Sequence, residues 1–417
     1  MISFVWSPGT PLPAGTGGTE NYTVGQVREL CRRGVDARVV TVGVGTSDGR
    51  EGFPGVPFVS LAEVADVADL EGAVIFVGEF PHVRTITGAF QMLHVPPPAL
   101  PHHRDRMRTQ VSDRILIATS RFAARLWAEF LDVDVDTIAV VHPFAEHEFA
   151  AVARQPRRSG RTGVLYAGRL SPEKGIFTLL SMLHHELLTE IRRDGTCSFT
   201  VTRAGDDKPQ GRIIRDMVST HPGLSLVDAA SSPTAMADLM SLHDIVVMPS
   251  NAQYWHETFG IVSLEAQHAG CRVVASDDGG LPETDCGAIT LVTPDDAAAL
   301  AAGISHAIGL GAVPARERVH AGTMFTAGQS VDSLLDVLAR PHRPTPATVL
   351  EQLEILARLP PSIHPPMPHQ ERAMTDKSPR QHLSKKSGKS LKQKRADKRA
   401  STQEPSTPTP GARRPAR

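Results

Sequence analysis

Short runs of four to six apolar residues alternate along this chain with segments whose apolar residues recur at helical spacing. The runs have the length and the β-branched content of strands that are buried on both faces. A strand that alternates with a helix returns to the same sheet as a parallel neighbour, through a right-handed crossover. The pattern therefore predicts an α/β fold built from doubly wound parallel sheets.

The predicted strands form two series. The first covers residues 2–6, 37–42, 73–77, 89–95, 115–119 and 138–141, and the second covers 164–167, 198–202, 224–227, 245–248, 273–276 and 289–292. Residues 154–162 between them are rich in Arg, Pro, Gly and Ser and lack periodicity, so we interpret them as a linker. We predict two Rossmann-like domains, an N-terminal one over 1–153 and a C-terminal one over 163–340. Their ligand is expected in the cleft where the carboxyl ends of the strands face each other.

The character of the chain changes after Arg340. Residues 341–359 are predicted to hold one Pro-flanked helix, and residues 360–417 are rich in Pro, Lys and Ser and are predicted to be disordered. Residues 377–417 carry 13 Lys and Arg against 2 Asp and Glu, a net +11, so the rest of a chain of net charge −1 carries −12. We expect this basic tail either to be solvated or to be attracted weakly to an anionic membrane. It has no interleaved aromatic residues, so no specific nucleic acid is expected as a partner.

The bulk composition is that of a globular protein. The 417 residues exceed what one core holds comfortably, and the apolar share of 41% is ordinary. The four cysteines form no CxxC pair and lie near apolar stretches, which predicts reduced core residues. No positive charge precedes the first apolar run, and the apolar stretch 297–313 is broken by polar residues and glycines, so neither a secretory signal nor a membrane span is predicted. We expect a cytoplasmic enzyme, with the tail as a peripheral contact to the inner membrane face.

Two cations mark a candidate phosphate site. The segment Gly168-Arg169-Leu170-Ser171-Pro172-Glu173-Lys174-Gly175 follows the strand predicted at 164–167 and precedes a helix predicted at 176–183. The start of a helix presents free N–H groups and a positive dipole end, which suit a diphosphate. Arg169 can offer a forked pair of donors and Lys174 a point charge. A solvated surface turn is the plain alternative, and the eight-residue stretch as a whole favours the phosphate site.

Two carboxylates mark a candidate sugar site. Glu257 and Glu265 lie eight residues apart, where the chain passes from the strand at 245–248 into a helix predicted from about residue 259 to 270. Carboxylates accept hydrogen bonds from sugar hydroxyls. Because its neighbours in the helix are apolar, Glu265 is expected to have a buried partner. The helix start offers a second phosphate cradle, formed by the N–H groups of Phe259, Gly260 and Ile261.

Weaker signals come from the N-terminal half. Gly15, Gly17 and Gly18 lie between the first strand and the first helix, where glycine lets the backbone approach a ligand closely. His94 lies at the carboxyl end of a predicted strand. Turn geometry for the glycines and a structural role for the histidine remain open alternatives. No cofactor and no metal site is predicted, because the Asp-x-Asp-x-Asp run at 132–136 is interpreted as a solvated turn.

Three segments, taken in order, resemble the glycosyltransferases of the GT-B fold, specifically the retaining GT4-type family (glycosyl transferases group 1). They are the segment 168–175, the pair Glu257-x7-Glu265, and Ala275-Ser276-Asp277-Asp278-Gly279-Gly280-Leu281-Pro282-Glu283. The resemblance covers about residues 1–338 and is strongest over 163–283. It departs from the family pattern at His142-Pro143-Phe144-Ala145, where members often have Asn-Gly-Val-Asp.

The resemblance implies a role for each candidate residue. Arg169 and Lys174 are expected to bind the donor diphosphate, and Glu265 the ribose hydroxyls. Glu257 is expected to contact the transferred sugar, aided by the backbone from Phe259 through Gly260 to Ile261. In the N-terminal domain, Gly17 and Gly18 match the family's glycine loop, and His94 matches a histidine near the donor sugar.

The implied reaction moves a sugar from a nucleoside-diphosphate sugar to an acceptor hydroxyl with retention of configuration and without a metal ion. Two alternatives remain. One is a nucleotide-sugar epimerase of the same fold, which would need acid and base residues on both faces of the sugar. The other is a degenerate nucleotide-sugar-binding protein with a basic docking tail. The donor sugar, its base and the acceptor are not identified by any motif.

Overall fold

The computed structural model describes residues 1–13, 17–79, 81, 83, 89–98, 103–155, 160–186, 188, 196–253 and 255–340. Gly15, residues 156–159 of the expected linker, the helix predicted within 341–359 and the basic tail lie outside the described residues.

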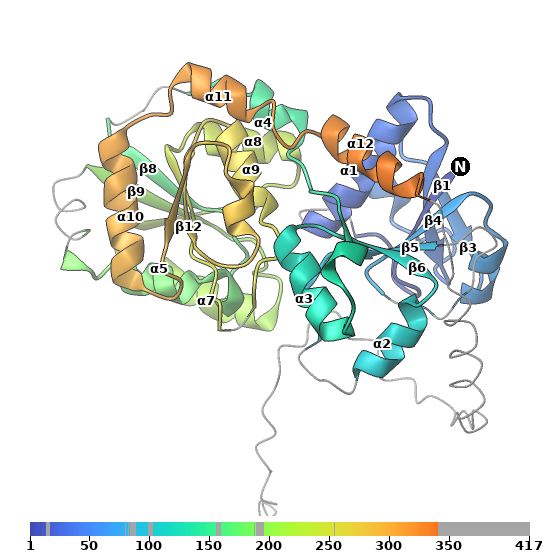
Figure 1. Cartoon of the computed structure of the whole chain (residues 1–417). Helices are drawn as coiled ribbons and strands as arrows, with labels where there is room; N and C mark the ends of the chain where they lie inside the picture. Colours follow the sequence, from blue (N-terminus) through green and yellow to red (C-terminus); the bar gives the residue numbers. More distant parts are fainter. Residues whose placement is uncertain are drawn as a thin grey trace, which may run out of the picture. The chain divides into compact units, whose positions relative to one another are not determined.

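The first sheet contains seven strands in the order β3-β2-β1-β4-β5-β6-β7, and all neighbouring pairs are parallel (Figure 1). Phe4 at its centre lies opposite Val39 on one side and Ile75 on the other. The strands are β1 (Ile2–Val5), β2 (Ala37–Val42), β3 (Phe58–Leu61), β4 (Ala73–Val77), β5 (Ala89–Leu93), β6 (Arg114–Ala118) and β7 (Ala139–Val140). Six of these were predicted, and the edge strand β3 was not.

The second sheet contains six parallel strands in the order β10-β9-β8-β11-β12-β13. The predicted series of six is confirmed. The strands are β8 (Thr162–Tyr166), β9 (Cys197–Thr202), β10 (Leu224–Val227), β11 (Ile245–Met248), β12 (Arg272–Ser276) and β13 (Ile289–Val292).

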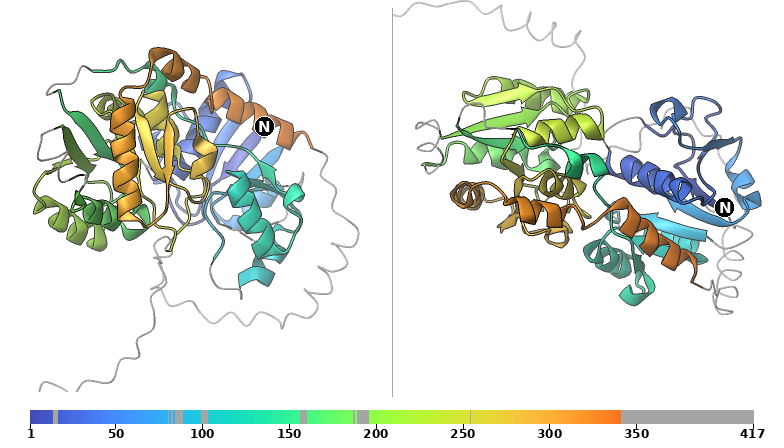
Figure 2. Two further views of the ribbon diagram at one scale, coloured as in Figure 1. Left: turned by 60° about the vertical axis from the view of Figure 1, so that its left-hand side comes forward. Right: turned by 90° about the horizontal axis from the view of Figure 1, so that it is seen from above.

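Helices connect the strands and cover the sheets, as the two further views in Figure 2 show. The α-helices are α1 (Gly18–Arg32), α2 (Arg104–Val111), α3 (Arg121–Leu131), α4 (His147–Ala151), α5 (Ile176–Met182), α7 (Pro209–Ser219), α8 (Pro233–Ser241), α9 (Ile261–His268), α10 (Ala297–Leu310), α11 (Ala315–Ala321) and α12 (Ala327–Leu338). Short 3-10 turns are η1 (Arg50–Gly52), η2 (Val64–Asp69), η4 (Val135–Thr137), η5 (Pro172–Lys174) and η6 (Leu281–Thr284). The apolar stretch at 297–313 forms α10 and ends at Gly311, as predicted.

Both faces of each sheet are buried, which explains the continuous apolar runs. In β8, Val164 and Tyr166 join the core beneath α5 and α10, whereas Leu165 and Ala167 join the core beneath α8 and α9. Side chains of a strand point alternately to opposite faces, so a strand that is covered on both faces is apolar at most of its positions.

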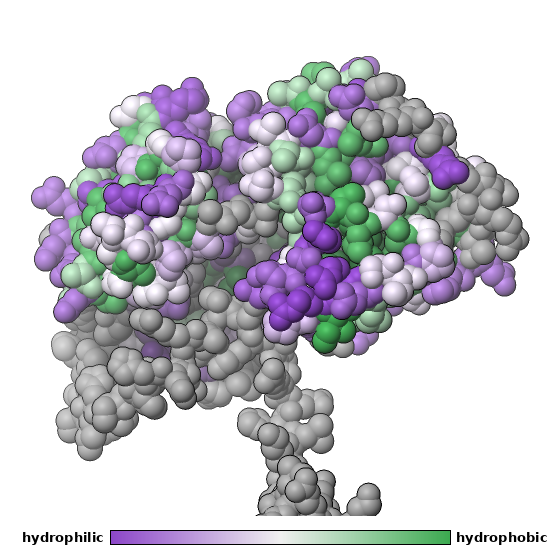
Figure 3. All heavy atoms as spheres, turned by 180° about the vertical axis from the view of Figure 1, so that it is seen from behind, coloured by the Kyte–Doolittle hydropathy of each residue, from purple (hydrophilic) through white to green (hydrophobic). Residues whose placement is uncertain are grey.

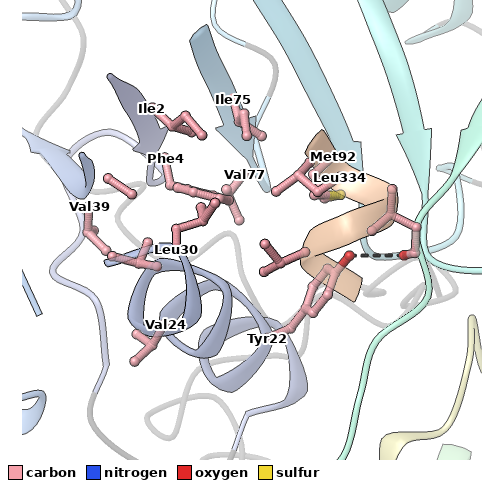
Figure 4. Packing of buried hydrophobic residues seen from close by; sticks show 14 of the residues in the cluster. Ile2, Phe4, Tyr22, Val24, Leu30, Val39, Ile75, Val77, Met92 and Leu334 are labelled. Carbon is pink, nitrogen blue, oxygen red and sulfur yellow. Dashed lines mark hydrogen bonds between the residues drawn. The ribbon is translucent and has the colours of Figure 1, made fainter. Parts of the chain in front are cut away.

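Two helices pack on a different domain from the one expected from the boundaries at residues 153 and 163. α4 joins the core of the second sheet through Phe149, and α12 joins the core of the first sheet through Val331, Leu334 and Val337. Figure 4 shows Leu334 among side chains from the strands and α1. The apolar stripe of a helix shows that one face is buried, but it does not identify the sheet that buries it.

The strand order reverses between β1 and β4 in the first sheet and between β8 and β11 in the second. Ligands of open α/β sheets bind outside the carboxyl ends of the strands at such reversal points. The candidate residues follow these strands: the glycine loop follows β1, the cations follow β8, and Glu257 follows β11.

No helix among the described residues is both long and apolar enough to cross a membrane. On the face shown in Figure 3, hydrophilic residues lie between smaller hydrophobic areas. Scattered apolar surface of this kind is normal for folded domains.

Candidate functional site

The buried side chain of Tyr166 holds the loop that carries Arg169 and Lys174 in place. The hydroxyl of this buried tyrosine donates to the carbonyl oxygens of Arg169 (2.8 Å) and Lys174 (3.2 Å). Gly175 ends the loop with a φ of 72°, and a Cβ there would lie 1.6 Å from the carbonyl oxygen of Pro249. Only glycine fits this close approach, so the sequence fixes where the loop stops and α5 begins.

The Lys174 ammonium pairs directly with the carboxylate of Glu257. The two residues are 83 positions apart in sequence and meet because β8 and β11 are neighbours. Ser250 also donates to Glu257 at 3.2 Å. Burial pushes the pKa of Glu257 upward, but the charge and hydrogen bond of Lys174, with help from Ser250 and Arg169, hold it below its ordinary value. Glu257 is therefore an ionised carboxylate at neutral pH.

Arg169 is more exposed and less firmly paired than Lys174. Its side chain is 60% exposed, and its nearest carboxylate is Glu173 at 3.7 Å, an exposed type of pair that contributes little to stability. Its charge nevertheless helps to lower the pKa of Glu257, and it opposes the rise that burial produces in the pKa of Glu20 in the first domain. The guanidinium thus stands beside residues of both domains while remaining free to bind an anion.

The start of α9 offers unused donors. The N–H groups of Phe259, Gly260 and Ile261 have no acceptor among the described residues. The predicted helix start near residue 259 is shifted by two residues, because Gly260 adopts a left-handed φ of 97° and α9 begins at Ile261. These N–H groups form a cradle beside Glu257 that suits phosphate or sugar oxygens.

Glu265 lies one turn further along α9. The buried partner that was expected for its carboxylate is not found among the described residues. Glu265 is half-buried, and no described residue donates a hydrogen bond to its carboxylate. Burial, reinforced by the negative charge of Glu146, raises its pKa to about 7. A carboxylate left without donors in the protein is suited to accept them from the hydroxyls of a ligand.

His94 lies directly after β5 and is buried. Its Nε2 has no hydrogen-bond partner in the part of the chain that the structure describes, and its ring meets that of Tyr22 edge-on at 5.4 Å. Burial lowers the pKa of His94 to about 3, so the imidazole is neutral at pH 7. Its carbonyl oxygen accepts a 2.7 Å bond from the hydroxyl of Thr258, which joins the strand end of the first domain to the Glu257 loop of the second.

The glycine loop meets α9. Gly17 precedes α1 as its N-cap, Gly18 begins the helix, and a Cβ on Gly18 would lie 3.3 Å from Cδ1 of Ile261. Sequence reasoning missed Glu20, whose carboxylate folds over Gly17. Burial raises the pKa of Glu20, while the charge of Arg169 acts in the opposite direction.

Sequence reasoning also missed Ser250 and Thr258. Thr258 lies between Glu257 and Phe259, which had been identified, and Ser250 lies two residues after the end of β11. A polar residue at the carboxyl end of a buried strand was an available signal. Among the described residues, no group of three His, Cys, Asp or Glu side chains could hold a metal ion.

Comparison with known proteins agrees with this geometry. Residues 161–309, which contain both cations and both carboxylates, match the family described as "Glycosyl transferases group 1". This match covers about a third of the chain. The chain is 35% identical over 158 residues to a glycogen synthase of Mycobacterium tuberculosis, a match that covers 36% of this chain and 35% of the relative. A D-inositol 3-phosphate glycosyltransferase of Jonesia denitrificans is 30% identical over 221 residues, covering 49% of this chain and 50% of the relative. The matches thus span about a third to a half of the length of these relatives.

Solved structures share the two-domain fold of this chain. A glycosyltransferase from Rickettsia africae superposes with a TM-score of 0.64 at 15% identity, over 81% of this chain and 97% of that one. HepE of Anabaena, solved in complex with UDP, gives a TM-score of 0.62 at 17% identity, over 81% of this chain and 99% of that one. At these identities the likeness shows the GT-B fold alone.

Proposed function

We propose that this chain transfers a sugar from a nucleoside-diphosphate sugar to an acceptor hydroxyl, with retention of configuration and without a metal ion. The observation that carries the proposal is the cluster at the ends of β8 and β11. There the ammonium of Lys174, the carboxylate of Glu257 and the free N–H groups from Phe259 to Ile261 lie together. The ammonium suits an anion, the carboxylate suits a sugar hydroxyl, and the N–H groups suit a second set of anionic oxygens.

The diphosphate of the donor is assigned to Lys174, Arg169 and the N–H groups of α9. Negative charge grows on the leaving phosphate as the glycosidic bond breaks, and preplaced cations and N–H dipoles stabilise that charge without reorganising. Lys174 already faces one carboxylate, so the diphosphate would share its ammonium with Glu257. HepE is solved with UDP and with UDP-glucose, which supports a nucleoside-diphosphate sugar as the donor class.

The sugar end of the donor is assigned to Glu257 and His94, and the ribose hydroxyls to Glu265. Glu257 is ionised and can accept hydrogen bonds from sugar hydroxyls. His94 is neutral and buried with an unpartnered Nε2, so it can bond a sugar oxygen without contributing a charge. Gly17 and Gly18 let the start of α1 lie close to Glu20 and to Ile261 of α9, which places this loop beside the proposed donor site.

The proton balance favours transfer over epimerisation. An epimerase needs an acid and a base poised near neutral pH on opposite faces of the sugar. At the sugar end, the pKa of His94 is about 3 and the pKa of Glu257 is held below its ordinary value, so neither group is poised, and Glu265, whose pKa is about 7, is assigned to the ribose instead. In the proposed transfer the acceptor hydroxyl attacks on the face of the leaving phosphate, which takes the proton itself, and no protein base is required.

The test replaces the cations and measures donor binding. Lys174→Gln should weaken the binding of the matching donor by about 30- to 150-fold, because a charge-assisted contact worth about 2–3 kcal/mol is lost. Arg169→Gln should cause a smaller loss, since that side chain is 60% exposed. UDP-, GDP- and ADP-glucose would be titrated by calorimetry to find the donor.

Lys208→Gln is the matched control. Lys208 is the other lysine that precedes the basic tail, and its side chain is 62% exposed at the start of α7. It should bind donor as the wild type does. Equal affinity for donor in Lys174→Gln, Lys208→Gln and the wild type would remove the assignment of the diphosphate site.

A further inference from the structure

The loop that carries Glu257 is held by the first domain through three contacts, made by His256 and Thr258. The ring of His256 lies 5.6 Å from that of Phe122, edge-on. The Thr258 carbonyl oxygen accepts a 2.5 Å bond from the Ser120 hydroxyl, and the Thr258 hydroxyl donates to the first domain at the end of β5. Two of these contacts converge on one place, the N-terminus of α3.

Glu283 of the second domain also binds the N-terminus of α3. We call these contacts between α3 and the second domain the junction. The two carboxylate oxygens of Glu283 accept from the backbone N–H groups of Arg121 (2.9 Å) and Phe122 (2.7 Å), the first residues of α3. Its Oε2 also lies 3.4 Å from Nε2 of His142. Burial pushes the pKa of Glu283 upward, but the bonds from His142, Arg121 and Phe122 hold it below its ordinary value. The carboxylate is therefore ionised, as the positive end of a helix prefers.

A rigid backbone connection joins Glu283 to Glu257. Glu283 lies in η6, directly after Gly279 and Gly280. The N–H of Gly280 donates to the carbonyl oxygen of Glu257 at 2.8 Å, and a Cβ on Gly279 would lie 2.2 Å from that same oxygen. The two stretches of backbone touch, so a shift of η6 must move Glu257.

The contact is more than an ordinary helix cap. α3 already has a local N-cap, because Ser120 accepts the N–H of Ala123 at 2.9 Å. Glu283 adds acceptors for the next free N–H groups from a position 162 residues away, on the other sheet. A cap needed only for the stability of α3 could have been supplied within a few residues of the helix start.

We propose that Glu283 is a positioning residue that sets Glu257 in register with the first domain by binding the N-terminus of α3. Through η6 and the backbone of Gly280, the same contact fixes the free N–H groups of α9 relative to His94. The role in catalysis rests on the proposed function, because it is the donor that Glu257 and His94 would share. The mechanical coupling between α3 and the Glu257 loop does not depend on any ligand.

The coupling is tested by amide hydrogen exchange on the full-length protein without ligand. Glu283→Ala removes the contact from one side, and Thr258→Val removes the bond to His94 from the other. If the junction is one unit, Glu283→Ala should accelerate exchange over residues 256–264 at least fivefold. Thr258→Val should in turn accelerate exchange of the Arg121 and Phe122 amides, because coupling is reciprocal.

Asp296→Ala is the matched control, since Asp296 also accepts two backbone N–H groups at a helix start. Its partners are Ala298 and Ala299 of α10, within the second domain. It should leave exchange at both ends of the junction unchanged. If each of the three variants affects only its own hydrogen-bond partners, Glu283 is a cap and the proposal is overturned.

The effect on catalysis is measured separately, by determining kcat and KM for each variant. Glu283→Ala should lower kcat about 10- to 100-fold, as small misplacements in active sites do, with a smaller change in KM. Glu283→Gln, whose amide oxygen can still accept one of the two N–H groups, should recover part of that loss. A wild-type protein that neither binds nor uses nucleotide sugars would refute the proposed function, while the exchange data would still decide the coupling. Unchanged kcat in Glu283→Ala would refute the positioning role.

Discussion

Glu265 is predicted to reduce the stability of the protein at neutral and alkaline pH. Its carboxylate is half-buried on α9, has no hydrogen-bond donor among the described residues, and has a pKa raised to about 7 from a usual value of 4.5. Replacement by glutamine keeps the shape and removes the charge. We expect Glu265→Gln to be more stable than the wild type at pH 8 and to bind donor more weakly, since a hydroxyl acceptor is lost.

The sign and size follow from proton linkage. Between pH 4.5 and about 7 the folded protein keeps a proton on Glu265 that the unfolded chain has released, so wild-type stability falls as the pH rises through this window. Glutamine has no proton to lose and escapes this fall. The gain of Glu265→Gln should be about 1 kcal/mol at pH 5 and about 3 kcal/mol at pH 8.

The assay is urea unfolding of the wild type and the variant at both pH values. Glu317→Gln, an exposed carboxylate on α11, is the control and should show no gain at either pH. Glu146→Gln removes the neighbouring negative charge and should shrink the gain from Glu265→Gln. An equal gain at pH 5 and pH 8, or no gain at pH 8, would refute the reasoning that an unsatisfied charge sits on α9.

Three further predictions concern the loop, the metal and the tail. Gly175→Ala should lower the free energy of unfolding by about 2–5 kcal/mol, because a left-handed φ is combined with a backbone clash. Gly34→Ala, at a φ of 77° with open space around it, should lower it by only about 1–2 kcal/mol. Equal losses of the two variants in urea unfolding would contradict this. Transfer should be unchanged in excess EDTA, because Arg169 and Lys174 supply the positive charge; loss of activity with rescue by Mg²⁺ or Mn²⁺ would show otherwise. A chain that ends at Pro360 should keep donor binding but no longer co-sediment with anionic liposomes at low salt, since its +11 segment is gone; equal sedimentation of both chains would exclude this role.

The sequence was sufficient for the two sheets because both faces of each are covered. Strands such as β4 and β11 are apolar at every position, which distinguishes them from helices and loops. The edge strand β3 was missed because it is short, half-buried along its length and preceded by Pro57. An edge strand has one neighbour and less burial, so its pattern is weak.

The contacts across the two domains could not be predicted in the same way. The cations and carboxylates were recognised because each lies within a short motif after a strand. Glu283 was quoted in such a motif without a role, because its partners at the start of α3 lie some 160 positions earlier. Nothing in local periodicity connects these positions. The partnerless state of Glu265 was likewise invisible, since its apolar neighbours predict burial and not the lack of a donor.

Because α12 packs on the first domain, it also sets the order in which the protein can fold during synthesis. The first sheet is complete once β7 has emerged from the ribosome, yet Val331, Leu334 and Val337 of its core are made nearly 200 residues later. At 5–20 residues per second that gap lasts about 10–40 s. For this interval the first domain has an uncovered apolar face beside α1, so it is a natural client for a chaperone. The sheet of the second domain can form before α12 is synthesised, whereas the core of the first domain is complete only after α12 has packed on it.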